Sequence, residues 1–174
     1  MARIGLIYGS DSGSTKRVAK KIKALFDDET MGDPLDAGRI QPEQLLAYDF
    51  IIAGTPTVGV GEIPSDWEEF MARVDGADFS GKTVAVFGLG DQFCYSDSFA
   101  DAMGELAEFF ADRGAKVVGA WPVDGYTYDA SQAEKDGHFV GLALDEDNQA
   151  DKSPERLKTW LNQIAGDFGF AAVA

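Results

Sequence analysis

The sequence predicts an α/β fold in which a doubly wound parallel sheet of five strands carries helices on both faces. Short, continuous apolar runs alternate along the chain with segments whose apolar residues recur at helical spacing. Continuous apolar runs are typical of parallel strands that are buried on both sides. No linker or repeat interrupts this alternation, so we expect residues 1–174 to form a single domain.

In the first half of the chain, apolar runs predict strands, and apolar stripes at spacing i, i+3, i+4, i+7 predict helices. Helices are expected after Thr15, over residues 41–46 with a proline near the start, and from a cap at Ser65. The expected strands are Ile4–Tyr8, Pro34–Ala37 and Phe50–Gly54.

The second half continues the pattern but contains one long polar stretch. A helix is expected to end before Gly114, and a last helix has Ser153 as its predicted cap and Pro154 as its first residue. The polar stretch at residues 122–138 is long for a connection inside a compact domain. The expected strands are Thr83–Gly88, Lys116–Trp121 and Phe139–Leu144.

Charge is the strongest signal in the composition. The formal net charge is −15, from 30 acidic and 15 basic residues. Such a surface repels nucleic acid and anionic membranes and attracts a protein with a basic face, although acidic residues also serve solubility alone. A single cysteine, Cys94, excludes an internal disulfide, and the N-terminus leads directly into a strand pattern, so we expect a cytoplasmic protein.

The loop Gly9–Thr15 joins the first strand to the first helix. A loop of small residues in this position can aim backbone N–H groups at an anion, and hydroxyl groups there add donors. An ordinary helix cap is the simpler alternative. Neither the Walker pattern nor the dinucleotide pattern is present, because Ser14 follows Gly13 where a lysine would be needed and Ser10-Asp11 follows Gly9.

The six residues from Ser10 to Thr15 match the [ST]-x-[ST]-G-x-[ST] phosphate loop of flavodoxins at every fixed position. The chain resembles this family over essentially its whole length. The resemblance implies the strand order 2-1-3-4-5, with FMN at the switch between strands one and three. It also implies the long-chain type, in which an insertion splits strand five, and the run from Phe139 to Gln149 is similar to that type.

The resemblance also implies roles for individual residues. Tyr95 would stack on the outer face of the flavin, and Val58 stands on the inner side, where other members often have tryptophan. The Gly59–Val60 peptide would rotate to accept a hydrogen bond from flavin N5, which glycine permits because it adopts positive φ at little cost; alternatively, Gly59 only forms a turn. The FMN-binding residues expected on this basis are Ser10, Asp11, Ser12, Gly13, Ser14, Thr15, Thr55, Pro56, Thr57, Val58, Gly59, Val60, Gly61, Leu89, Gly90, Asp91, Tyr95, Ser98 and Asp147.

The implied function is a low-potential, one-electron carrier with noncovalently bound FMN that alternates between semiquinone and hydroquinone. Carboxylates near the loops would disfavour the anionic hydroquinone. The resemblance implies a monomer whose partners are redox proteins with basic faces: flavodoxin or ferredoxin reductase as donor, and nitrogenase reductase or another low-potential acceptor. The acids expected around the site are Glu62, Asp66, Asp91, Asp97 and Asp101.

Two other functions share this topology. An FMN-dependent quinone reductase would need a substrate pocket over the flavin and usually a dimer, and we expect an electron carrier rather than an enzyme. A signalling receiver domain would need acidic residues where Tyr8-Gly9 and Ala53-Gly54 end their strands. No catalytic or metal-binding set is expected, because the one histidine, His138, lies in the polar stretch and Cys94 has no histidine near it in sequence.

Overall fold

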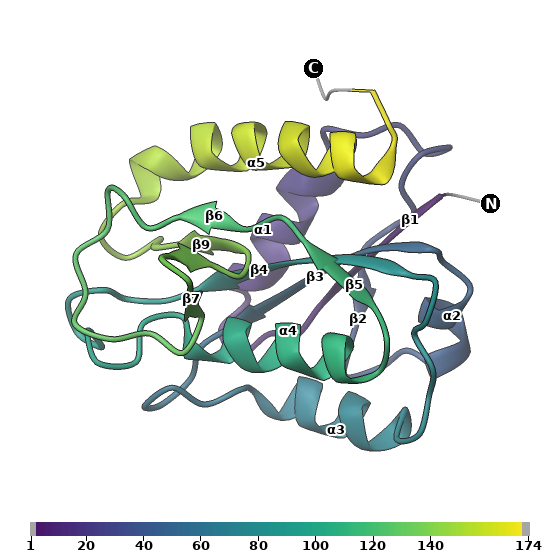
Figure 1. Cartoon of the computed structure of the whole chain (residues 1–174), viewed down its shortest axis with the longest axis horizontal. Coiled ribbons are helices and arrows are strands. Elements are labelled where there is room, and N and C mark those ends of the chain that lie inside the picture. Colours follow the sequence, from purple (N-terminus) through teal and green to yellow (C-terminus); the bar gives the residue numbers. More distant parts are fainter. Residues whose placement is uncertain (1–2, 172–174) are drawn as a thin grey trace.

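A computed structural model describes residues 3–171 of the chain. Its central sheet is parallel and has the order β2-β1-β3-β4-β5, which confirms the predicted topology (Figure 1). The fifth position is shared by two strands, because β5 and β9 both pair with β4. The strands of this sheet are β1 (Ile4–Tyr8), β2 (Leu35–Asp36), β3 (Phe50–Pro56), β4 (Thr83–Leu89), β5 (Lys116–Val118) and β9 (Leu142–Leu144).

Helices cover both faces of the sheet, and neighbouring residues of one strand pack against opposite layers. On one face, Ile52 of β3 packs with the apolar stripes of α1 and α5. On the other face, Ile51 and Ala53 pack with α3 and α4, where Trp67 and Phe110 are fully buried. The helices are α1 (Ser14–Lys23), α2 (Pro42–Leu46), α3 (Ser65–Arg73), α4 (Asp101–Asp112) and α5 (Ser153–Phe168), the last preceded by a 3₁₀ turn at Ala150–Lys152.

The single strand predicted for Lys116–Trp121 is wrong beyond Val118. Gly119 has φ +89°, and its carbonyl accepts a hydrogen bond from Trp160 Nε1 at 2.8 Å, so the chain turns out of the sheet at this residue. The strand predicted for Phe139–Leu144 is also divided. Its first part belongs to a small antiparallel sheet, and only its second part pairs with β4.

The insertion between β5 and β9 is therefore not structureless. Its antiparallel sheet has the order β6-β8-β7, formed by Trp121–Pro122, His138–Phe139 and Glu134–Lys135. Aromatic rings of the insertion pack on Phe99, whose centroid lies 5.4 Å from that of Tyr128. These contacts place the insertion beside the loop that follows β4.

Neither serine predicted to cap a helix does so. The α3 and α5 helices begin at Ser65 and Ser153 themselves, after Pro64 and Lys152, and neither cap residue makes a side-chain hydrogen bond. Ser153 Oγ instead donates to Glu146 Oε2 at 3.1 Å, in the loop that follows β9. Pro154 is accordingly the second helical residue, where a missing N–H still costs no intrahelical bond.

Candidate functional site

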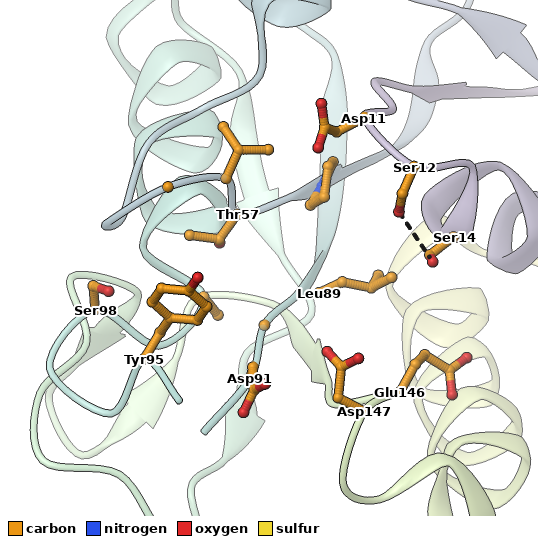
Figure 2. Close-up of a pocket in the computed structure, with 15 residues that line it drawn as sticks. Asp11, Ser12, Ser14, Thr57, Leu89, Asp91, Tyr95, Ser98, Glu146 and Asp147 are labelled. Carbon is orange, nitrogen blue, oxygen red and sulfur yellow. Dashed lines mark hydrogen bonds between the residues drawn. The ribbon is translucent and has the colours of Figure 1, made fainter. Parts of the chain in front are cut away.

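A cleft of about 410 Å³ opens beyond the carboxyl ends of the central strands. The loops after β1, β3, β4 and β9 line it, which is where ligands bind in sheets of this topology. Figure 2 shows Tyr95 and Ser98 on one side, Ser12 and Ser14 on the other, and Leu89 between them. The lining residues are Asp11, Ser12, Ser14, Pro56, Thr57, Val58, Gly59, Leu89, Gly90, Asp91, Tyr95, Ser98, Ala100, Glu146 and Asp147.

The loop after β1 is held in shape by its own residues and by α3. Gly13, with φ +90°, precedes the first residue of α1, and no side chain caps the helix. The N–H of Gly13 donates to Ser10 Oγ at 3.0 Å, and the N–H of Ser10 donates to Asp66 Oδ2 at 3.2 Å. Asp66 therefore positions this loop rather than standing free at its rim.

Donors at the start of α1 have no acceptor among residues 3–171. In the described part of the chain, the N–H groups of Ser12, Ser14 and Thr15 donate no hydrogen bond. The side-chain oxygen of Thr15, a residue that is 1% exposed, is also without a partner among the described residues. An unpaired buried hydroxyl is unfavourable unless a ligand satisfies it, so this loop fits an anion better than it fits an ordinary helix cap.

The loop after β3 forms a tight hairpin. Val58 and Glu62 exchange two backbone hydrogen bonds, both of 2.8 Å. Between them, Gly59 and Gly61 have φ +52° and +80°, which glycine adopts without strain, and Val60 at the tip is 76% exposed. The peptide that was expected to rotate therefore lies at an exposed turn whose first residue already has positive φ.

The loop after β4 carries Tyr95, which is 48% exposed and lines the cleft (Figure 2). Its shape depends on Asp91, whose Oδ1 accepts hydrogen bonds from the N–H groups of Phe93 and Cys94 and from Asn148 Nδ2. Burial opposes ionisation of Asp91, but these hydrogen bonds hold its pKa below the ordinary value. The same carboxylate raises the pKa of the exposed Cys94 thiol by hydrogen bonding and charge.

A buried carboxylate joins the walls of the cleft. Asp145, which is fully buried, accepts hydrogen bonds from the backbone and side chain of Gln92, at 3.1 and 2.8 Å, and from Asn148. Gln92 Oε1 in turn accepts the N–H of Thr127 in the insertion at 2.6 Å. This network ties the loop after β4 to the loop after β9 and to the insertion.

The structure brings most of the predicted site residues into one cleft. Six of them do not line it. Ser10 and Gly13 shape the first loop, Thr55 is buried with its hydroxyl on the Pro56 carbonyl, and Gly61 packs against Asp101. The predicted residues outside the lining are Ser10, Gly13, Thr15, Thr55, Val60 and Gly61.

Two lining residues were not predicted. Ala100 is a non-glycine residue with φ +55° at the start of α4, and no sequence pattern marks such a residue. Glu146 was not among the predicted site residues, but it lines the cleft beside Asp147 (Figure 2). Its position next to Asp147 was the available signal.

The acids around the cleft differ in their burial and in their pKa. Asp101, one of the acids expected around the site, is 6% exposed and accepts the N–H of Gln132 at 2.7 Å, so its carboxylate is not open to a partner protein. Burial raises its pKa, and the hydrogen bond from Gln132 partly opposes that rise. The pKa of Asp147 is also raised, first by burial and then by the charges of Asp91, Asp145 and Glu146. Additional negative charge in the cleft is therefore unfavourable.

Within residues 3–171, no group of three or more histidine, cysteine or acidic side chains is arranged to hold a metal ion. Over the same residues, no helix combines the length and the apolar character that a membrane crossing requires.

Comparison with known proteins identifies the family. The family described as Flavodoxin matches residues 6–160. The flavodoxin of Synechococcus elongatus is 46% identical over 97% of this chain and 99% of its own length, and that of Haemophilus influenzae is 41% identical over the full length of both. The crystal structure of Fusobacterium nucleatum flavodoxin bound to flavin mononucleotide superposes with a TM-score of 0.88, at 30% identity, over 96% of this chain and 99% of that one. The chain belongs to the flavodoxin family.

Proposed function

We propose that this protein is an electron carrier that holds FMN noncovalently in the cleft and transfers one electron at a time between redox proteins. The observation that carries this proposal is the convergence, in one cleft, of a loop with free hydrogen-bond donors and an aromatic ring. The loop precedes α1, and the ring is that of Tyr95 (Figure 2). The solved relative with flavin mononucleotide bound supports the choice of cofactor.

The residues of the first loop fit a phosphate group. The N–H groups of Ser12, Ser14 and Thr15 and the unpaired hydroxyl of Thr15 provide donors at the positive end of a helix dipole. Ser10, Gly13 and Asp66 would act indirectly, by holding the loop in shape. Hydrogen bonds to an ionised group are among the stronger ones in proteins, so these donors would supply much of the binding free energy.

The remaining walls would hold the flavin ring. Tyr95 would cover its outer face, and Val58 would stand at its inner face without an aromatic plane. Leu89, Gly90 and Asp91 would meet the pyrimidine edge, and Ser98 and Asp147 the ribityl chain or the ring edge. When bound, FMN supplies the one-electron redox chemistry. The Gly59 carbonyl is the proposed acceptor of a hydrogen bond from N5–H, because it lies in the turn that is exposed at Val60 and glycine adopts a rotated peptide conformation at little cost.

The negative charge of the site would lower the reduction potential of the bound cofactor. Asp11, Asp91, Glu146 and Asp147 line the cleft, and the whole chain has a formal charge of −15. Reduction that adds negative charge to this site is opposed by the carboxylates, which makes the fully reduced protein a strong donor. The proposal is therefore a low-potential carrier.

We further propose that the protein acts as a monomer and that residues 1–174 form one domain. The single domain is supported by two core clusters that share the strands of one sheet. The proposed electron donor is a flavodoxin or ferredoxin reductase, and the proposed acceptor is nitrogenase reductase or another low-potential protein. A cytoplasmic location is supported by the exposed thiol of Cys94, because free thiols persist in reducing compartments.

Reconstitution tests the function directly. The purified protein, freed of any bound cofactor, is titrated with FMN while flavin fluorescence and the visible spectrum are recorded. Quenching to a one-to-one endpoint, followed by a one-electron step on stepwise reduction, is the expected result. A protein that neither quenches FMN fluorescence nor retains a flavin spectrum refutes the proposal, and efficient catalytic turnover of a quinone would favour a reductase instead.

A further inference from the structure

The α1 helix carries only positive charges in a strongly acidic protein. Between Ser14 and Lys23 it contains five basic residues and no acid, whereas the chain as a whole has twice as many acidic as basic residues. Lys23 forms an ion pair with Asp28 at 2.7 Å, away from the cleft. The remaining basic side chains of the helix, those of Lys16, Arg17, Lys20 and Lys21, belong to exposed residues.

Arg17 differs from the lysines because its side chain folds back onto the loop. Its Nη2 donates to Ser14 Oγ at 2.9 Å. A Cβ atom built on Gly13 would lie 3.4 Å from its Nη1, so the guanidinium group reaches the start of the helix. Ser14 lines the cleft, and its hydroxyl is 3.4 Å from that of Ser12 (Figure 2).

This guanidinium group has no counter-charge among the residues that the structure describes. Within residues 3–171, Arg17 takes part in no ion pair. A guanidinium carries five N–H donors in a rigid plane, and the side chain of Arg17 uses one hydrogen bond, to Ser14. The proposed phosphate would meet the carboxylates of Asp11 and Glu146 in the same cleft, and the hydroxyls of the loop carry no charge that could offset them.

We propose that Arg17 is a further cofactor-binding residue, whose guanidinium group lies beside the loop before α1 and favours the phosphate of FMN in its dianionic form. The inference rests on the proposed FMN site and adds to it a charged contact that determines specificity. Arginine suits this role because its planar donors match phosphate oxygens. The contact makes phosphorylated flavin preferred over riboflavin, and it makes that preference sensitive to salt because the group is exposed.

The test compares Arg17→Gln with Lys21→Gln. Lys21 lies one helical turn beyond Arg17 on the same face, so its substitution removes the same charge at a greater distance from the loop. Cofactor-free protein is titrated with FMN and, separately, with riboflavin, at low and at high ionic strength. We expect Arg17→Gln to weaken FMN binding about tenfold at low salt. Riboflavin binding and the Lys21→Gln variant should each stay within about twofold of the unmodified protein.

Phosphorus NMR of bound FMN provides a second readout. The phosphate of the Arg17→Gln complex should change from dianion to monoanion at a higher pH than that of the unmodified complex, because a nearby cation favours the dianion. Equal FMN affinity in Arg17→Gln and the unmodified protein overturns the inference, as does equal weakening of FMN and riboflavin or an equal loss in Lys21→Gln. If the unmodified protein binds no FMN at all, the proposed function itself fails.

Discussion

The unpaired hydroxyl of Thr15 predicts that one substitution will stabilise the cofactor-free protein and weaken its binding of FMN. Thr15 is 1% exposed, and its Oγ1 has no partner in the described residues. Burying a hydroxyl without a partner costs about 1–3 kcal/mol. Valine has the same branched shape and a similar helix propensity, so Thr15→Val should raise the free energy of unfolding of the cofactor-free protein by about 1 kcal/mol.

Binding should change in the opposite direction. If Thr15 Oγ1 donates to the phosphate of FMN, its loss removes a hydrogen bond to a charged group, which is worth about 1.5–3 kcal/mol. This difference corresponds to an FMN affinity about 10- to 100-fold weaker. Urea unfolding of the cofactor-free protein measures the first effect, and quenching of flavin fluorescence measures the second.

Thr55 offers a matched control. It is fully buried like Thr15, but its Oγ1 donates to the Pro56 carbonyl at 2.8 Å. Thr55→Val should therefore lower the free energy of unfolding of the cofactor-free protein by about 1 kcal/mol. A cofactor-free Thr15→Val protein that is less stable than the unmodified one refutes the reasoning. Unchanged FMN affinity in this variant would show that Thr15 does not contact the phosphate.

The other predictions concern the turn at Gly59, the buried acid Asp101 and the exposed acids Glu62 and Asp97. Gly59→Val places a β-branched residue at φ +52°, so stepwise reduction should show a smaller maximum of the one-electron-reduced form; an undiminished maximum counts against the peptide rotation. Burial raises the pKa of Asp101 above its ordinary 3.8, despite the opposing hydrogen bond from Gln132. The ionised carboxylate of Asp101 therefore destabilises the fold at neutral pH. This destabilisation fades as the pH falls through the raised pKa of the folded protein towards 3.8. Asp101→Asn should thus be more stable than the unmodified protein in urea at pH 7 and lose this advantage near pH 4, whereas an advantage independent of pH would contradict the assignment. The rate at which a ferredoxin reductase reduces the protein, measured by stopped flow, should fall as ionic strength rises, and neutralising Glu62 and Asp97 together should make this fall smaller. An unaltered salt dependence means that these acids do not steer the partner.

The sheet was predictable because most of its strands are marked by a short run of apolar residues in the local sequence. Runs such as Ile4–Tyr8 are apolar on both faces, and helices between them leave a parallel sheet as the compact solution. The order of the strands came from the resemblance to flavodoxins. The apparent strand from Lys116 to Trp121 failed because the signal that ends it is a contact with Trp160, which is distant in sequence.

The site was predictable where one segment carries the signal. In the loop from Gly9 to Thr15, a hydrogen bond between Gly13 and Ser10 shapes the backbone, and the free donors lie within the same few residues. The local sequence pattern was therefore enough to predict this part of the site. The supporting network around Asp145 joins residues 53 positions apart, and Asp101 is buried by contacts with the insertion and with Gly61. Such burial follows from tertiary packing, which residue spacing does not report.

The split fifth strand has a consequence for how this chain could be shortened. Val118 is paired with Ala85 of β4, and Leu142 is paired with Phe87, so a single residue of β4 separates the points where the chain leaves the sheet and where it returns. Residues 119–141 thus form an excursion that preserves the register, and one bridging residue in their place would complete a continuous strand. Such a chain would keep its sheet but uncover Phe99, against which Tyr126, Tyr128 and Phe139 now pack. The excursion therefore lies outside the strand pairing of the central sheet and covers the loop that carries Tyr95.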